Sequence, residues 1–297
     1  MLGVLMTVVG AVMLASKGIF AKVLYARGLH FDTVVATRAL LAIPGFLLMA
    51  LWRHGPQPMR QLPWRDIWRA ALAGFVCYAV GASLNFFALT RIDASVERAL
   101  LYAYPAMVVL AAWALGREKP GPIMSLAVIG TFVGILMVVG IWRAGQGGQD
   151  LVGVASVLLC AATIAYYYLA SGPLTRSMGS AQFTFVAMTA AGVALAVHYQ
   201  WKHGWQTVSL DAQSWELMVA LVIFATVLPL VAVAEGLRRI GPQRAAIAST
   251  SGPPAAAIMA AVILHESVAS WQWLGIATIA ASIALLEVRR ARRLRRR

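Results

Sequence analysis

The sequence predicts an all-α membrane protein with ten transmembrane helices, arranged as two inverted five-helix repeats. Composition is the first observation: of 297 residues, 61% are hydrophobic and 12% are charged, whereas soluble domains average about 45–50% and about 25%. The second is that apolar runs of bilayer-spanning length recur along the whole chain. The third is that the two halves superpose at a shift of 148 residues, which places Leu89 on Leu237.

Ten apolar runs predict the ten helices, because about 20 apolar residues cross the roughly 30 Å hydrocarbon core. They lie at residues 2–25, 33–51, 67–90, 95–115, 122–141, 151–170, 180–198, 214–237, 243–263 and 270–288. Only the connections 52–66 and 199–213 are long, so no room remains for a soluble domain. No basic residue precedes the first run, which also exceeds the core of a signal peptide. We therefore expect that run to be retained as a helix.

The distribution of lysine and arginine predicts the orientation. Ten spans place both termini on one side, and that side carries 17 basic residues against five on the other. The positive-inside rule therefore predicts cytoplasmic N- and C-termini. Residues 289–297 form a basic cytoplasmic tail beside the last span, where attraction to anionic lipid explains the charge. No basic–aromatic module accompanies it, so nucleic-acid binding is not expected.

The two halves, residues 2–141 and 149–288, repeat their helix-breaking residues. Three mid-run pairs and one acidic pair coincide: Pro105 with Pro253, Gly81 with Pro229, Pro44 with Gly192, and Glu118 with Glu266. Five helices are an odd number, so the two copies must have opposite orientations. Matched broken helices in inverted repeats are typical of secondary transporters. Any single pair has a simpler explanation, because glycine and proline are common in membrane helices; three pairs in one register favour the transporter.

Several passages carry a resemblance to a known family. They are "GIFAKVL" with Lys22, "VVATRALLAI" with Arg38, "FFALTRIDAS", "YAYPAMVVLAAWALGREK", and residues 237–279 from "LRRIGPQRAAIASTSGPP" onward. On these the chain resembles the drug/metabolite transporter superfamily, EamA type, and within it the bacterial inner-membrane exporters of aromatic and other neutral amino acids. Arg117 inside "GREKP" and His265 inside "LHES" depart from the family pattern. The resemblance implies a ten-helix carrier with a central cavity between inverted halves, working by alternating access.

Polar and aromatic residues at mid-depth of the broken helices are the candidate substrate-binding set. They are Tyr78, Asn85, Tyr102, Pro105, Tyr166, Phe183, Ser249, Ser251 and Pro253. Three consecutive tyrosines cannot all point into a cavity, and Tyr167 is the one expected to face lipid. The candidate gating and hinge residues are Lys22, Arg38, Gly81, Pro229, Glu118 and Glu266. Snorkelling to the surface is an equally good interpretation of Lys22 and Arg38.

The candidate cavity set is uncharged, which narrows the substrate. A phosphorylated solute would require lysine or arginine at mid-depth, and a cationic drug would require a carboxylate there. A zwitterionic amino acid fits if its charged groups meet the backbone groups freed at the helix breaks. The prediction is export of neutral amino acids, aromatic and other apolar ones. The alternatives are another small uncharged metabolite or drug, or, in a different class, a channel or a membrane sensor.

Enzymatic chemistry is not predicted. The segment "STSG" has Ser249 where a Gly-x-Ser-Gly elbow needs glycine, and the sequence contains no HExxH motif. We expect no cofactor and no metal, and a monomer in a bacterial inner membrane whose partners are the substrate and the lipid bilayer. The apparent lack of an intramembrane Asp or Glu favours facilitated export over proton exchange.

Overall fold

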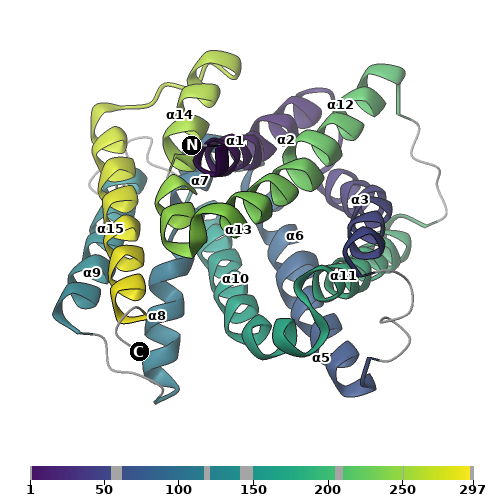
Figure 1. Cartoon of the computed structure of the whole chain (residues 1–297). Helices are drawn as coiled ribbons and strands as arrows, with labels where there is room; N and C mark the ends of the chain where they lie inside the picture. Colours follow the sequence, from purple (N-terminus) through teal and green to yellow (C-terminus); the bar gives the residue numbers. More distant parts are fainter. Residues whose placement is uncertain are drawn as a thin grey trace.

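A computed structural model describes residues 2–54, 62–116, 121–140, 150–204, 210–249 and 251–294. Every regular element in those residues is helical, and they contain no strand (Figure 1). The first half comprises α1 (Leu2–Ala15), α2 (Lys17–Ala26), α3 (Phe31–His54), α5 (Trp64–Gly74), η1 (Phe75–Gly81), α6 (Ala82–Ala88), α7 (Ala94–Leu101), α8 (Tyr104–Ala114) and α9 (Pro122–Val139). The second comprises α10 (Leu151–Met178), α11 (Ser180–His203), α12 (Ala212–Val222), η3 (Ile223–Val227), α13 (Leu228–Ser249), α14 (Gly252–Ile263) and α15 (Ser270–Leu294).

These helices make the chain a multi-pass membrane protein. Eight helical segments among the described residues are long and apolar enough to cross a bilayer, and two shorter apolar helices cover Gly252–Ile263 and Ser270–Leu285. Large apolar side chains lie exposed on the outside of the bundle, such as Leu48 at 67% and Val262 at 68%. Apolar surface of this extent is expected of helices that face lipid.

Several predicted boundaries differ from the structure, two of them in the C-terminal part of the chain. A connection was expected at residues 238–242, but α13 runs through it to Ser249. Leucine, arginine and alanine around this point are good helix formers, and Glu235 accepts a hydrogen bond from Arg239 one turn later at 2.7 Å. At the other end, α15 reaches Leu294, so most of the predicted tail is helical.

Helix boundaries in the two halves fall at matching positions. The helices α5 and α12 begin at residues 64 and 212, and the π-helical segments η1 and η3 begin at residues 75 and 223. The helices α7 and α13 end at residues 101 and 249, and α8 and α14 begin at residues 104 and 252. Each pair is separated by the 148 residues that relate the halves in the sequence. π-helical turns are rare and often mark functional sites.

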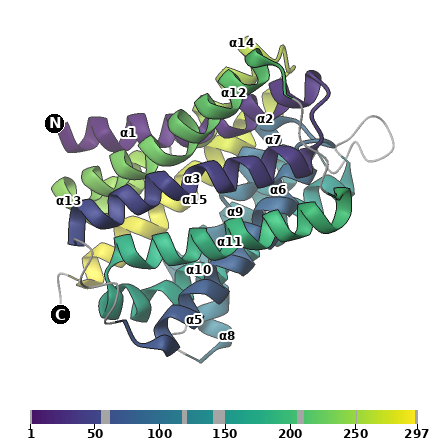
Figure 2. The same cartoon turned by 90° about the vertical axis from the view of Figure 1, so that its right-hand side faces the viewer.

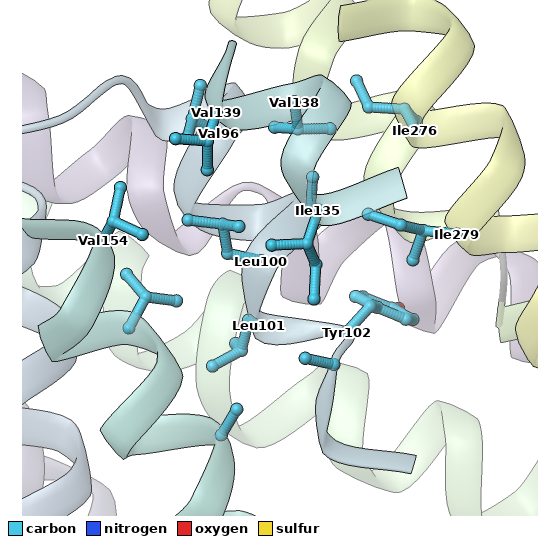
Figure 3. Packing of buried hydrophobic residues seen from close by; sticks show 14 of the residues in the cluster. Val96, Leu100, Leu101, Tyr102, Ile135, Val138, Val139, Val154, Ile276 and Ile279 are labelled. Carbon is cyan, nitrogen blue, oxygen red and sulfur yellow. The ribbon is translucent and has the colours of Figure 1, made fainter. Parts of the chain in front are cut away.

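The packing joins the two halves along their lengths. The helix α1 packs against α13, α3 against α11, and α9 against α15 (Figure 1). The helix α1 begins and α15 ends at the same end of the bundle (Figure 2). One apolar core lies among α7, α9, α10 and α15, where Leu100, Ile135 and Ile279 are buried (Figure 3). A second, with Leu24 and Phe86, lies among α2, α3, α6 and α12.

Candidate functional site

The two central helix breaks touch one another. Tyr102 lies between α7 and α8, and its hydroxyl donates a hydrogen bond to the carbonyl of Ser249, the last residue of α13, at 2.9 Å. Gly252 stands against the same hydroxyl, where any side chain would overlap the Tyr102 ring. Two segments 147 residues apart in the sequence are therefore joined at their breaks.

Proline explains why the Ser249 carbonyl is available to Tyr102. Pro253 lies in the first turn of α14, a position where a missing N–H is tolerated. In a continuous helix, the N–H of residue 253 would donate to the carbonyl of residue 249. Proline has no such donor, so the carbonyl accepts the Tyr102 hydroxyl instead. Pro105 holds the same position in α8. Ser251 supports the end of α13 by donating to the carbonyl of Ala248 at 2.8 Å.

A row of aromatic rings extends from this junction. Tyr104 stacks on Tyr168 with centroids 5.2 Å apart. Tyr167 lies next to Tyr168, packs edge-on against Tyr78 at 5.1 Å, and packs in a tilted arrangement against Phe183 at 5.2 Å. We call Tyr102, Tyr104, Tyr168, Tyr167, Tyr78 and Phe183 the aromatic row. Tyr102 begins it, 6.3 Å from the Tyr104 ring.

The assignment of the consecutive tyrosines is reversed by the structure. Tyr166 is 41% exposed and follows Val152 and Leu159, also exposed, on the outer face of α10. Tyr167 instead packs between Tyr78 and Phe183. Successive helical residues are about 100° apart, so turning one tyrosine inward turns its neighbour outward. Tyr167 therefore packs inward where Tyr166 was expected to, and Tyr168, although 52% exposed, stacks on Tyr104.

Charged side chains are buried inside the bundle, next to a candidate cavity set that was predicted to be uncharged. Glu97 is 1% exposed, within the span Ala94–Ala114. Lys17 donates to the Asn85 side-chain oxygen at 2.5 Å and lies 3.5 Å from the Glu97 carboxylate. Asn85 donates its amide to the same carboxylate at 2.5 Å. Asn85 thus bridges two charged groups and has both side-chain atoms engaged. An acidic residue inside the apolar run "SVERALL" was the signal available in the sequence.

Two arginines lie buried near this bridge, each 7% exposed. The Arg38 guanidinium lies over the Phe86 ring at 5.0 Å and is 3.5 Å from the Thr226 hydroxyl in η3. The Arg98 guanidinium lies over the Tyr102 ring at 5.3 Å. The Nε atoms of both arginines are buried and have no hydrogen-bond partner among the described residues. We call Lys17, Arg38 and Arg98 the basic cluster.

Lys22 and Glu266, both predicted as gating residues, meet at one end of the bundle. Their side chains form an ion pair at 3.3 Å. Glu266 also accepts hydrogen bonds from the backbone N–H of Ala94 at 2.9 Å and from the Ser95 hydroxyl at 3.0 Å. A carboxylate there satisfies donors and complements the positive end of α7. Its predicted counterpart, Glu118, lies outside the described residues.

Gly81 and Pro229, the predicted hinges, are points of close helix contact. A side chain on Gly81, the last residue of η1, would overlap the Thr163 hydroxyl of α10. Pro229 is buried beside Gly10 of α1. A Cβ atom added to Gly10 would lie 3.0 Å from the Pro229 carbonyl oxygen. Both therefore allow neighbouring helices to approach closely next to a π-helical segment.

Charged groups also gather where α3 begins and α11 ends. His30 and His203 lie 3.2 Å and 3.3 Å from the buried Asp32 carboxylate, a grouping that could hold a metal ion. The Lys202 ammonium is 2.5 Å from the same oxygen, so the carboxylate already has a cation. On the same face, hydrogen bonds from Ser214 and the Arg27 guanidinium hold the pKa of Asp211 below its ordinary value.

The fold and the junction of broken helices define a helical membrane transporter. The EamA-like transporter family matches residues 1–140 and again residues 151–288. The chain therefore belongs to this family of transporters, as the resemblance indicated.

Relatives agree with this membership. The Bacillus subtilis (strain 168) protein named "Uncharacterized transporter YcbK" is 32% identical over 293 residues, 97% of this chain and 93% of that protein. The Salmonella typhimurium protein named "Uncharacterized inner membrane transporter YicL" is 25% identical over 305 residues, 99% and 97% of the two chains. A crystal structure of another protein has a TM-score of 0.67 and 18% identity, and covers 98% of both chains. That likeness concerns the fold alone.

Proposed function

We propose that this chain exports neutral amino acids, aromatic and other apolar ones, across a bacterial inner membrane. The carrying observation is the aromatic row beside the junction of the two helix breaks. Tyrosine and phenylalanine rings offer adaptable apolar walls for a side chain of varied size. Backbone groups freed at a break can receive the polar end of a small solute. Both features stand together at Tyr102.

Alternating access between two inverted repeats is the proposed mechanism. It is supported by the matched helix boundaries and by the two separate matches of the family to residues 1–140 and 151–288. The packing supports it too: α1 packs against α13, and α10, one repeat later, packs against α6 of the first half. We propose that both chain ends are cytoplasmic, as the arginine and lysine distribution predicts, and that the monomer is the working unit.

Glu97 makes proton coupling a candidate mechanism alongside facilitated export. Facilitated export was favoured because no intramembrane acid was recognised, and Glu97 removes that reason. An ionisable residue inside a membrane span is a candidate for a proton pathway. An imposed pH gradient across the same vesicles separates proton exchange from facilitated transport.

Uptake by purified protein in liposomes tests the proposal. Radiolabelled phenylalanine and leucine should enter protein-containing vesicles faster than empty ones, and bulky neutral amino acids should compete best. Glutamate, arginine and a sugar phosphate serve as charged comparisons. Transport of an uncharged drug or metabolite without any neutral amino acid would replace the substrate class. Equal permeation by all solutes at high flux would indicate a channel.

A further inference from the structure

The buried charges of the first half do not balance. Lys17 lies within electrostatic reach of both Arg38 and Arg98, and Glu97 is the acidic group there. Cys160 and Tyr25 also face this region, but thiols and phenols ordinarily remain neutral near pH 7. Lys17, Arg38 and Arg98 thus outnumber Glu97, because Asp32, the other carboxylate near Tyr25, is already paired with Lys202. An unpaired buried cation is costly in a low-dielectric interior, so a compensating anion would be bound favourably.

Arg98 is the member of the basic cluster with the fewest partners. Lys17 is engaged with Asn85 and Glu97, and Arg38 approaches the Thr226 hydroxyl. Arg98 has the Tyr102 ring beneath its guanidinium, and its Nε has no partner in the described part of the chain. Glu97 is adjacent in sequence, but neighbouring helical residues do not face each other. Arg98 therefore keeps its Nε donor free although the residue is only 7% exposed.

The position of Arg98 connects the charge imbalance to the proposed substrate. Arg98 and Tyr102 are four residues apart, on one face of the chain as it enters the break. Tyr102 both receives the guanidinium on its ring and holds the Ser249 carbonyl. The aromatic row begins at the same residue. A ligand with an anionic end and an apolar end would meet Arg98 with the first and the row with the second.

We infer that Arg98 binds the carboxylate of the transported amino acid. The planar guanidinium presents parallel N–H donors that match the two oxygens of a carboxylate. The inference rests on the proposed function, and it names the group that holds the charged end of the substrate. In this inference Lys17 and Arg38 supply positive charge around the site, and Arg98 makes the contact with the carboxylate. An inorganic anion such as chloride could supply the same charge, and the test distinguishes the two.

Ligand binding to purified protein, followed by tryptophan fluorescence, tests the assignment without requiring transport. The probes are L-phenylalanine, 3-phenylpropionate, which lacks the amine, phenethylamine, which lacks the carboxylate, and sodium chloride. Wild-type protein should bind the two carboxylates at least about tenfold more tightly than phenethylamine, because a hydrogen bond to a charged group has that effect. In Arg98→Gln this preference should fall to within about threefold, and Arg98→Lys should retain part of it.

Arg91→Gln is the matched control. Arg91 pairs with Asp150 at 2.9 Å outside the predicted spans, and its loss should leave the carboxylate preference unchanged. A wild-type preference in folded Arg98→Gln overturns the inference, as does competition by chloride with no carboxylate preference. Where Arg98→Gln does not purify as a folded protein, Arg98→Lys decides: an unchanged ratio overturns the assignment.

The two proposals fail in different ways. Carboxylate binding that depends on Arg98, without uptake of any neutral amino acid, overturns the proposed function and leaves the carboxylate site. Uptake of phenylalanine that is equal in wild type and Arg98→Gln leaves the proposed function and removes the carboxylate site.

Discussion

The two halves of the molecule place their helices alike but carry different residues at matching positions. The charged and amide side chains of the first half, Lys17, Arg38, Asn85, Glu97 and Arg98, correspond after 148 residues to Ala165, Val186, Val233, Ala245 and Ala246. Helix boundaries at the breaks nevertheless coincide. The second half therefore forms the same helices with apolar residues at all five positions. Charge at these five positions is not needed to form these helices.

This difference indicates a functional role, beyond stability, for the buried charged residues of the first half. A buried ion pair is often no more stabilising than apolar residues of similar volume. The apolar residues at these positions of the second half are therefore expected to stabilise the fold at least as well as the charged residues of the first. Ionisable groups inside a membrane mark solute and ion pathways. We therefore attribute the charge of the first half to substrate handling and the matched boundaries to the scaffold.

The largest expected effect comes from breaking the buried bridge. Lys17→Met removes the ammonium that pairs with the buried Glu97 carboxylate and donates to Asn85, and should lower the free energy of unfolding by about 3–5 kcal/mol. Equilibrium unfolding in detergent micelles measures it. The quintuple variant Lys17→Met, Arg38→Met, Asn85→Val, Glu97→Leu, Arg98→Met makes this region apolar, like the corresponding positions of the second half. It should recover to within about 2 kcal/mol of wild type while losing transport. Full activity in that variant would contradict a functional role for the charges.

The two prolines at the breaks allow the halves to be compared directly. Pro253→Ala supplies the N–H that a continuous helix would donate to the Ser249 carbonyl, and Pro105→Ala does the same for Leu101. Each should change the free energy of unfolding by less than about 1 kcal/mol and lower liposome uptake about tenfold, which is equivalent to about 1.4 kcal/mol. Wild-type flux in both variants would show that the breaks are not needed for transport.

The spans and breaks were predictable because a single physical constraint dominates each. Bilayer thickness sets the length of an apolar run, and proline removes a donor at a defined position. This is why the apolar runs are largely helical in the described residues and why Pro105 and Pro253 lie in the first turns of new helices. The region 238–242 was missed because its helix-forming residues outweigh Gly241 and Pro242, a local balance that hydropathy does not express.

The candidate site was predictable only where backbone geometry decided it. Tyr102 and Ser249 meet because both sit at breaks. Tyr166 was chosen over Tyr167 because hydropathy does not fix how an apolar helix is rotated about its axis. Glu97 was overlooked because an acid near the end of a span looks interfacial, and its partners Lys17 and Asn85 come from two other helices. Such contacts depend on tertiary packing.

The smallest expected effect tests whether proline and tyrosine act on the same carbonyl. Tyr102→Phe removes the hydrogen bond to Ser249 and should cost about 1 kcal/mol of unfolding free energy. In a Pro253→Ala background the new backbone N–H takes over that carbonyl, so the same change should cost close to nothing. Tyr166→Phe, on the exposed outer face of α10, is the control and should be neutral in both backgrounds. A double-mutant cycle measures the coupling. If Tyr102→Phe costs the same in both backgrounds, the Tyr102 hydrogen bond does not depend on the donor that Pro253 lacks. The helix break of the first half would then have a cause different from that of the second.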